Sequence, residues 1–208
     1  MKEIGITGTP VTNEHVEAGL HKTREALRAL LEFQANDAPT HLRLAEVLSQ
    51  QGDPNGAIEE YRAAIQLDPG HARAFLGLGA VYLDQHEWRQ AESALERAAR
   101  FDSKNSQTQY WLGRSRLAQH KFYEAQQAFS TTTRLNPDEA EGFSDLGLTY
   151  MAQGQSREAI NALRHAIRVR PDFSEAHSRL ELTQAFQINE ERLVQETAKI
   201  VHVLFRRE

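Results

Sequence analysis

The stretch AEGFSDLGLTYMAQGQSREAINALRHAIRVRPDF, residues 140–173, has the pattern of two short helices joined by a turn. Its first half repeats apolar or small side chains at the spacing of one helical face: Phe143, Leu146, Gly147 and Tyr150. Gly154 follows, and glycine readily takes the left-handed backbone conformation that ends a helix. The second half ends before Pro171, because proline lacks the amide hydrogen-bond donor. The stretch therefore predicts a helix–turn–helix unit of 34 residues.

The same unit recurs along most of the chain at a constant step of 34 residues. One series of identical residues is Leu44, Leu78, Leu112, Leu146 and Leu180. A second series is Ala57, Ala91, Ala125 and Ala159. No insertion or deletion disturbs this register between residues 38 and 187. Because fixed periods of 20 to 50 residues are the signature of solenoids, we expect four stacked units, 38–71, 72–105, 106–139 and 140–173.

These units resemble tetratricopeptide repeats (TPRs). That family's 34-residue pattern has an aromatic residue at position 4, Leu at 7, Gly or Ala at 8 and Tyr at 11. It continues with Ala at 20 and 27, a large apolar residue at 24 and Pro at 32. The third unit departs most, with Gln109, Arg116 and Thr132 at positions 4, 11 and 27. The resemblance implies an all-α fold, a right-handed α-solenoid of antiparallel helix pairs, with four full repeats and a partial capping repeat at each end.

Glycine at position 8 needs a reason, because glycine inside a helix costs about 1 kcal/mol relative to alanine. It occurs there in three repeats, as Gly79, Gly113 and Gly147. We expect it to let the alanine-bearing second helix of the repeat approach the first helix almost backbone to backbone.

The flanks of the array are predicted to cap it. Residues 1–12 are interpreted as a flexible tail and residues 13–37 as an N-terminal capping helix. Residues 174–208 are predicted to form a C-terminal capping helix pair, with Asn189 as the N-cap of its second helix. The alternative for this last segment is a homo-oligomer interface through Leu193, Ile200, Val201, Leu204 and Phe205.

The resemblance places the first helix of each repeat on the concave side of the solenoid. Positions 2, 5, 9 and 12, bordered by 6 and 13, form the stripe opposite the packing face. The candidate partner-binding residues on this stripe are Arg43, Glu46, Arg73, Leu76, Leu83, Tyr110, Trp111, Arg114, Leu117, Asp145, Leu148 and Met151. Trp, Tyr and Arg are the residue types most enriched in interface hot spots, which favours a groove role for Tyr110, Trp111 and Arg114. For the leucines and Met151, packing against neighbouring helices is an equal alternative.

Composition argues against several other classes of protein. The chain has no Cys, so it has no disulfide and no thiolate metal site. Its formal charge is −5, without the basic footprint of a nucleic-acid-binding protein. No apolar run approaches the roughly 18 residues of a membrane span, so membrane insertion is not expected. The nine histidines show no metal-ligand spacing, and no catalytic set of side chains can be singled out. We therefore expect no enzyme, no cofactor and no bound metal.

The sequence thus predicts a non-catalytic scaffold or adaptor for protein–protein interaction, which holds a peptide or helix of a partner protein in its concave groove. The alternative is a self-assembling structural TPR protein that forms a homo-oligomer through its terminal helices or its tail. We expect a cytoplasmic location, because residues 1–12 lack the basic start and apolar stretch of a signal peptide. The periplasm is the alternative if an export signal has been removed.

Overall fold

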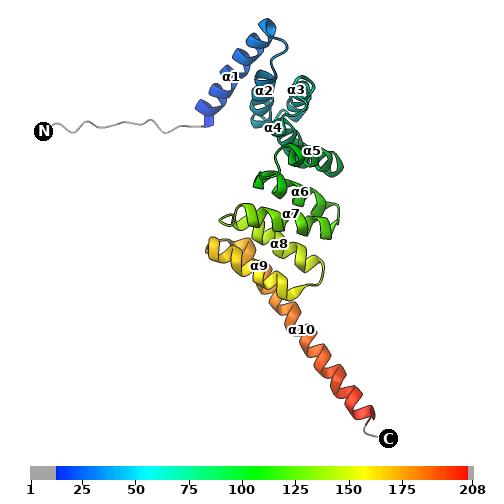
Figure 1. Cartoon of the computed structure of the whole chain (residues 1–208). Coiled ribbons are helices and arrows are strands. Elements are labelled where there is room, and N and C mark those ends of the chain that lie inside the picture. The colour runs from blue at the N-terminus through cyan, green and yellow to red at the C-terminus, as the bar shows by residue number, and fades with distance from the viewer. Residues whose placement is uncertain (1–12, 206–208) are drawn as a thin grey trace, which may run out of the picture.

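The computed structural model describes residues 13–205, with the side chains of residues 16–189 and 191–196. This part of the chain is built of α-helices and contains no strand (Figure 1). The helices are α1 Asn13–Phe33, α2 Ala38–Gln50, α3 Pro54–Leu67, α4 Ala72–Asp84, α5 Trp88–Phe101, α6 Ser106–Ala118, α7 Phe122–Leu135, α8 Ala140–Ala152, α9 Ser156–Val169 and α10 Ser174–Phe205. Consecutive helices pack against each other in an elongated array, which confirms the predicted all-α solenoid. None of the helices in residues 13–205 is both long and apolar enough to cross a membrane.

The turn inside each repeat uses the left-handed backbone conformation at position 15. Gly52 and Gly154 have φ angles of 74° and 72°, and His86 and His120 have φ angles of 61° and 59°. This conformation is uncommon for residues other than glycine. Both histidine rings contact the aromatic residue two positions further on, Trp88 at 5.0 Å and Phe122 at 5.7 Å between ring centroids. These ring contacts help to hold a backbone conformation that the histidines would otherwise adopt reluctantly.

The glycines at position 8 make room for one large side chain. A Cβ atom on Gly79 would lie 2.6 Å from Leu95, and one on Gly113 would lie 2.7 Å from Phe129. Both of these neighbours occupy position 24 of the same repeat. The expectation of a backbone-to-backbone contact is therefore corrected, because the nearest atoms belong to the side chain at position 24. A backbone neighbour appears only as a more distant contact at Gly147, where the Ala159 carbonyl oxygen would lie 3.4 Å away.

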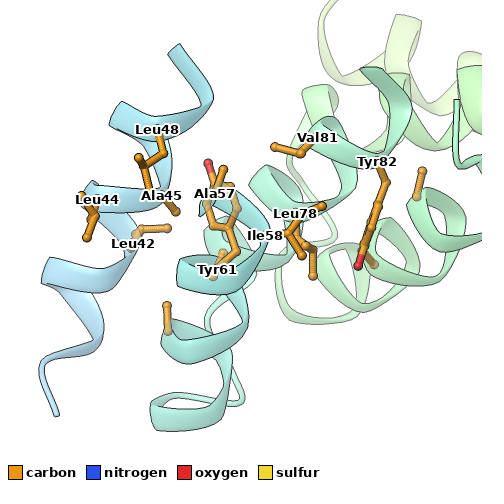
Figure 2. Packing of buried hydrophobic residues seen from close by; sticks show 14 of the residues in the cluster. Leu42, Leu44, Ala45, Leu48, Ala57, Ile58, Tyr61, Leu78, Val81 and Tyr82 are labelled. Carbon is orange, nitrogen blue, oxygen red and sulfur yellow. The ribbon is translucent and has the colours of Figure 1, made fainter. Parts of the chain in front are cut away.

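The first two repeats share one continuous apolar core with α1. Figure 2 shows Leu44 and Leu48 of α2, Tyr61 of α3 and Tyr82 of α4 in this cluster. The position-20 alanines are fully buried in all four repeats. Small side chains at this position allow the two helices of each repeat to approach closely, so the core is built within and between neighbouring helix pairs.

The third repeat keeps the register of the array but replaces apolar contacts with polar ones. Arg116 stands where the pattern has Tyr, and its Nε lies 3.1 Å from Glu92 Oε1 in the preceding repeat. Its Nη2 lies 3.0 Å from Glu96 Oε1. Thr132 is fully buried and donates a hydrogen bond of 3.1 Å to the Ala128 carbonyl. Departures from the pattern in this repeat are thus compensated by charge pairs and hydrogen bonds.

The N-terminal helix α1 packs on α2 through the buried Leu27, with Leu20 and Leu31 beside it. The helix ends at Phe33, and residues 34–37 connect it to the first repeat. Leu30 is 52% exposed at position 27 of the repeat pattern, where every full repeat has a fully buried residue. This exposure arises because α1 has no first helix of its own. The tail predicted for residues 1–12 lies outside the described residues.

The C-terminal segment is one continuous helix, so the prediction of a helix pair is wrong. α10 runs from Ser174 to Phe205, and Asn189 lies within it rather than at a cap. The segment around Asn189 contains no glycine or proline, and Gln187 donates a hydrogen bond of 3.0 Å to Glu191 one turn later. The first half of α10 packs on α9 through Ala176, whereas the second half extends away from the array (Figure 1). Of the predicted oligomer residues, Leu193 is 67% exposed, and the side chains of Ile200, Val201, Leu204 and Phe205 lie outside the described ones.

Candidate functional site

The first helices of successive repeats form a pocket of about 420 Å³, which we call the tryptophan pocket. It is lined by Leu83, Asp84, His86, Trp88, Trp111, Arg114, Leu117, Ala118, Asp145, Leu148 and Arg179. The predicted residues that it brings together are Leu83, Trp111, Arg114, Leu117, Asp145 and Leu148. They come from α4, α6 and α8, and Arg179 adds a wall from α10.

The repeat register explains why these residues meet. Trp111, Arg114 and Leu117 lie three residues apart on α6, so they share one face of that helix. Asp145 and Arg179 occupy the same position as Trp111 in the next two repeats, at steps of 34 residues. Because successive first helices stack with the same orientation, equal positions in neighbouring repeats become neighbours in space.

The exposed cation of the pocket is stacked on aromatic rings. The Arg114 Cζ atom lies 5.6 Å from the Trp111 ring centroid and 6.0 Å from that of Tyr110. The Tyr110 ring is itself held 6.0 Å from the buried Phe129. Among the described residues, no carboxylate forms an ion pair with Arg114. Its guanidinium is thus oriented by the rings, and its hydrogen-bond donors are open to a ligand.

Two acidic groups line the pocket: Asp84 is exposed, whereas Asp145 is already bound. Arg179 Nη1 lies 3.0 Å from Asp145 Oδ1 and also donates to the Ser144 hydroxyl at 2.7 Å. Burial raises the pKa of Asp145, although the charges of Arg179 and Arg114 and a hydrogen bond from Tyr110 act to lower it. The pKa of Tyr110 is raised by burial first and by the Asp145 charge second. Asp145 therefore fixes Arg179 and Tyr110 in place.

The remaining predicted residues lie apart from this pocket. Arg73 Nε and Glu46 Oε1 form an ion pair of 2.8 Å, and Glu46 adds to burial in raising the pKa of Tyr61 to about 12. Arg73 and Leu76 line a second depression of about 660 Å³. Met151 lines a small pocket beside α10, and Tyr110 packs beneath the tryptophan pocket without lining it. Arg43 is exposed on α2. The predicted stripe is thus divided into separate patches.

Sequence reasoning missed three pocket residues at the turn between α4 and α5. Asp84, His86 and Trp88 line the tryptophan pocket, although none is among the candidate partner-binding residues. Asp84 holds the border position 13 of the stripe, and His86 and Trp88 lie outside it. Trp88 begins a second helix, so a search confined to first helices overlooks it. The left-handed conformation of His86 brings the turn back over the pocket. The signal was present in the sequence as an aromatic residue two positions after the turn residue in this repeat.

The described residues contain no cluster of three His, Cys, Asp or Glu side chains that could hold a metal ion. The tryptophan pocket combines apolar walls, two indole rings and an available guanidinium. This combination suits the binding of a side chain together with an acidic group, since aromatic rings supply contact area and arginine supplies directed donors.

Several solved structures share this fold. MamA superposes with a TM-score of 0.71 at 23% identity, covering 84% of this chain and 99% of that chain. TTC0263, a thermophilic TPR protein in Thermus thermophilus, gives a TM-score of 0.63 at 18% identity, covering 83% and 92%. PilF of Pseudomonas aeruginosa gives 0.64 at 20% identity, covering 82% and 72%. Identities this low establish the fold alone. No curated protein sequence matches the chain.

A family pattern nevertheless covers the whole repeat array. The C-terminal domain of cilia and flagella-associated protein 70, a TPR domain, matches residues 11–200. This match includes all four full repeats and most of the two terminal helices. The chain therefore belongs to the TPR family of the cilia and flagella-associated protein 70 C-terminal domain.

Proposed function

We propose that this TPR scaffold binds a peptide segment of a partner protein in the tryptophan pocket. The TPR fold supports a protein-interaction scaffold in general. The observation that supports this particular site is Arg114, which is exposed, stacked on Trp111 and without a carboxylate within ion-pair distance among the described residues. We propose that a large apolar side chain of the ligand packs on Trp111 and Trp88 while a carboxylate binds Arg114.

The pocket is suited to such a ligand because its walls are already ordered. A volume of about 420 Å³ lies in the range of ordinary ligand pockets and accepts one or two large side chains. Asp145 and Arg179 neutralise each other at its edge, so the charges open to a ligand are those of Arg114 and of the exposed Asp84. Receptor groups that are ordered before binding lose little conformational entropy, which favours affinity.

The test uses a displayed library of random 12-residue peptides, panned against the full chain. Selected peptides are synthesised with a fluorescent label, and their affinities are measured by fluorescence anisotropy. Both tryptophans of the chain line the pocket, so a ligand there must also change the intrinsic tryptophan emission. Trp111→Ala is expected to weaken binding by about 2 kcal/mol, roughly 30-fold.

Tyr123→Ala is the matched control, because Tyr123 is a 66% exposed aromatic residue on α7 outside the pocket. This variant should bind as the wild type does. Circular dichroism of each variant checks that the helices remain folded. Equal affinity of the wild type and Trp111→Ala, or unchanged tryptophan emission on binding, would rule out this pocket as the binding site.

A second candidate function is self-assembly through α10. The second half of this helix projects from the array, and α10 carries several exposed apolar side chains: Leu182, Phe186, Ile188 and Val194. Light scattering over a range of protein concentrations tests this candidate. Growth of the particle mass with concentration that disappears on removal of residues 190–208 would support assembly, and a constant monomer mass would exclude it.

A further inference from the structure

We infer that the face of α4 and α5 away from the tryptophan pocket is a second docking surface, for an acidic peptide segment with aromatic or large aliphatic side chains. We call this surface the arginine groove. Phe75, Leu78 and Tyr82 of α4 form its floor, and Arg89, Ser93 and Arg97 of α5 form its wall, around a depression of about 330 Å³. It shares no residue with the tryptophan pocket.

The groove is positively charged in a protein whose overall charge is negative. Arg89 and Arg97 are exposed, and no carboxylate lines the depression. Arg62 of α3 adds a third guanidinium, since its Nη2 donates a hydrogen bond of 2.7 Å to the Tyr82 hydroxyl. None of these three arginines forms an ion pair with a carboxylate among the described residues. Three unpaired guanidinium groups at one place favour an acidic ligand.

The carboxylates of α5 are bound on another side of the helix. Glu92 and Glu96 are both paired with Arg116 of α6, and Glu92 is also 2.5 Å from Lys121 Nζ. Their charge is thus compensated by the third repeat and does not neutralise Arg89 or Arg97. α5 thus has an acidic side that packs against the third repeat and a basic side that is exposed. The positive charge of the groove therefore remains available to a ligand.

Aromatic contacts orient one of these arginines and extend the apolar surface. The Arg97 Cζ atom lies 5.7 Å from the Phe75 ring centroid. Phe75 in turn stacks on Phe101, with ring centroids 5.9 Å apart and planes at 19°. Phe101 is 53% exposed, so it offers apolar area next to the guanidinium. An arginine held over a ring keeps its donors free for bidentate contact with a carboxylate.

The fold of the repeat does not require this arrangement. The positions of Arg89, Ser93 and Arg97 in the second repeat correspond to Tyr123, Gln127 and Thr131 in the third. In the first repeat they correspond to Asn55, Glu59 and Ala63. The same backbone therefore forms with neutral or acidic residues at these places. In the fourth repeat Arg157 stands at the position of Arg89, but Asn161 and His165 stand at those of Ser93 and Arg97. The pair of arginines is thus specific to the second repeat, and with the tryptophan pocket the groove would let one chain hold two partner segments.

The test pans the random 12-residue peptide library against the full chain carrying Trp111→Ala, which removes the main contact of the tryptophan pocket. We expect enriched peptides to combine Asp or Glu with Phe, Tyr or Leu. Anisotropy with labelled peptides should show at least tenfold weaker binding to Arg89→Glu/Arg97→Glu. The affinity for the unmodified groove should also fall as salt is raised, because ions screen exposed charges.

Two further variants separate the groove from a general charge effect. Arg157→Glu/Arg168→Glu changes the net charge equally through exposed arginines of α9, and it should keep the affinity. Ser93→Phe fills the depression without changing the charge, and it should weaken binding. Equal affinity of the enriched peptides for the wild type and for the Trp111→Ala chain separates this site from the tryptophan pocket, so either proposal can fail alone.

Three results would overturn the inference. The first is equal binding of the enriched peptides to the wild type and to Arg89→Glu/Arg97→Glu. The second is an equal loss of affinity in both arginine double variants, which would indicate unspecific attraction. The third is an absence of acidic peptides from the selection while phosphatidylserine vesicles bind the wild type and not Arg89→Glu/Arg97→Glu, which would indicate a membrane surface instead.

Discussion

At the scale of single residues, the packing of the array depends on positions where a small residue leaves room for a large neighbouring side chain. The glycine at position 8 has no Cβ, and the freed volume is filled by the side chain at position 24. The first repeat has Ala45 at position 8, so its arrangement differs. Its position-24 residue, Tyr61, is accommodated by Gly77 of the next repeat, where a Cβ would lie 2.3 Å from the tyrosine ring. Close packing of this kind tolerates little added volume.

Gly113→Ala should therefore destabilise the protein, although alanine is the better helix former. The added Cβ would lie within 2.9 Å of three carbon atoms of the Phe129 ring, and the ring must move in a fully buried site. We expect the free energy of unfolding to fall by about 1–3 kcal/mol. Gly19→Ala is the control, because nothing lies within 4 Å of that Cβ, and it should gain about 0.5–1 kcal/mol. Urea denaturation measures both values, and a gain in both variants would contradict the packing argument.

At the scale of helices, the sequence predicts the repeats well and the C-terminus badly. Helical periodicity, Gly154 and Pro171 locate the helices and turns of the fourth repeat, and the constant step transfers them to the others. The same logic places Trp111 and Arg114 in one site. It misses Trp88 because the pocket crosses from first helices to the start of a second helix. Asn189 misleads because asparagine is accepted both at a cap and inside a helix, and the neighbouring sequence contains no breaker to decide between them.

The continuity of α10 can be measured directly, because the chain has no cysteine and accepts spin labels at chosen sites. Labels at Ser178→Cys and Gln195→Cys should lie about 26 Å apart, since a helix rises 1.5 Å per residue. A turn at Asn189 would bring them to roughly 12 Å. Labels at Arg157→Cys and Arg168→Cys within α9 provide a reference of about 17 Å for an unbroken helix. A short distance across Asn189 would restore the helix pair that the sequence predicts.

At the scale of the whole molecule, the array contains three apolar clusters, and a group of charged contacts lies between the first cluster and the other two. One apolar cluster spans α1 to α5 and reaches Leu112, and the next clusters begin at Ala125 of α7. Between them lies Glu92, whose side chain is 13% exposed and contacts Arg116, Gln119 and Lys121. The packing of the two halves of the solenoid against each other thus depends partly on the ionised carboxylate of Glu92, so the stability of the protein should depend on pH.

Glu92→Gln tests this dependence. Burial acts to raise the pKa of Glu92, but the hydrogen bonds from Lys121, Gln119 and Arg116 outweigh it and lower the pKa below 4.5. A carboxyl group whose pKa is lowered by folding stabilises the protein above its unfolded pKa, and this stabilisation is lost as the pH falls through the folded pKa. Near pH 7, Glu92→Gln should lower the free energy of unfolding by about 1.5–3 kcal/mol, the value of hydrogen bonds to charged groups. The difference from the wild type should shrink as the pH falls below about 4.5.

Glu124→Gln, at an exposed carboxylate on α7, is the control and should change the free energy of unfolding by less than about 1 kcal/mol. The prediction is contradicted if the difference in free energy of unfolding between the wild type and Glu92→Gln stays constant from pH 7 to below about 4.5. The contacts of Glu92 with Arg116 and Lys121 would then not stabilise the protein through the charge of Glu92.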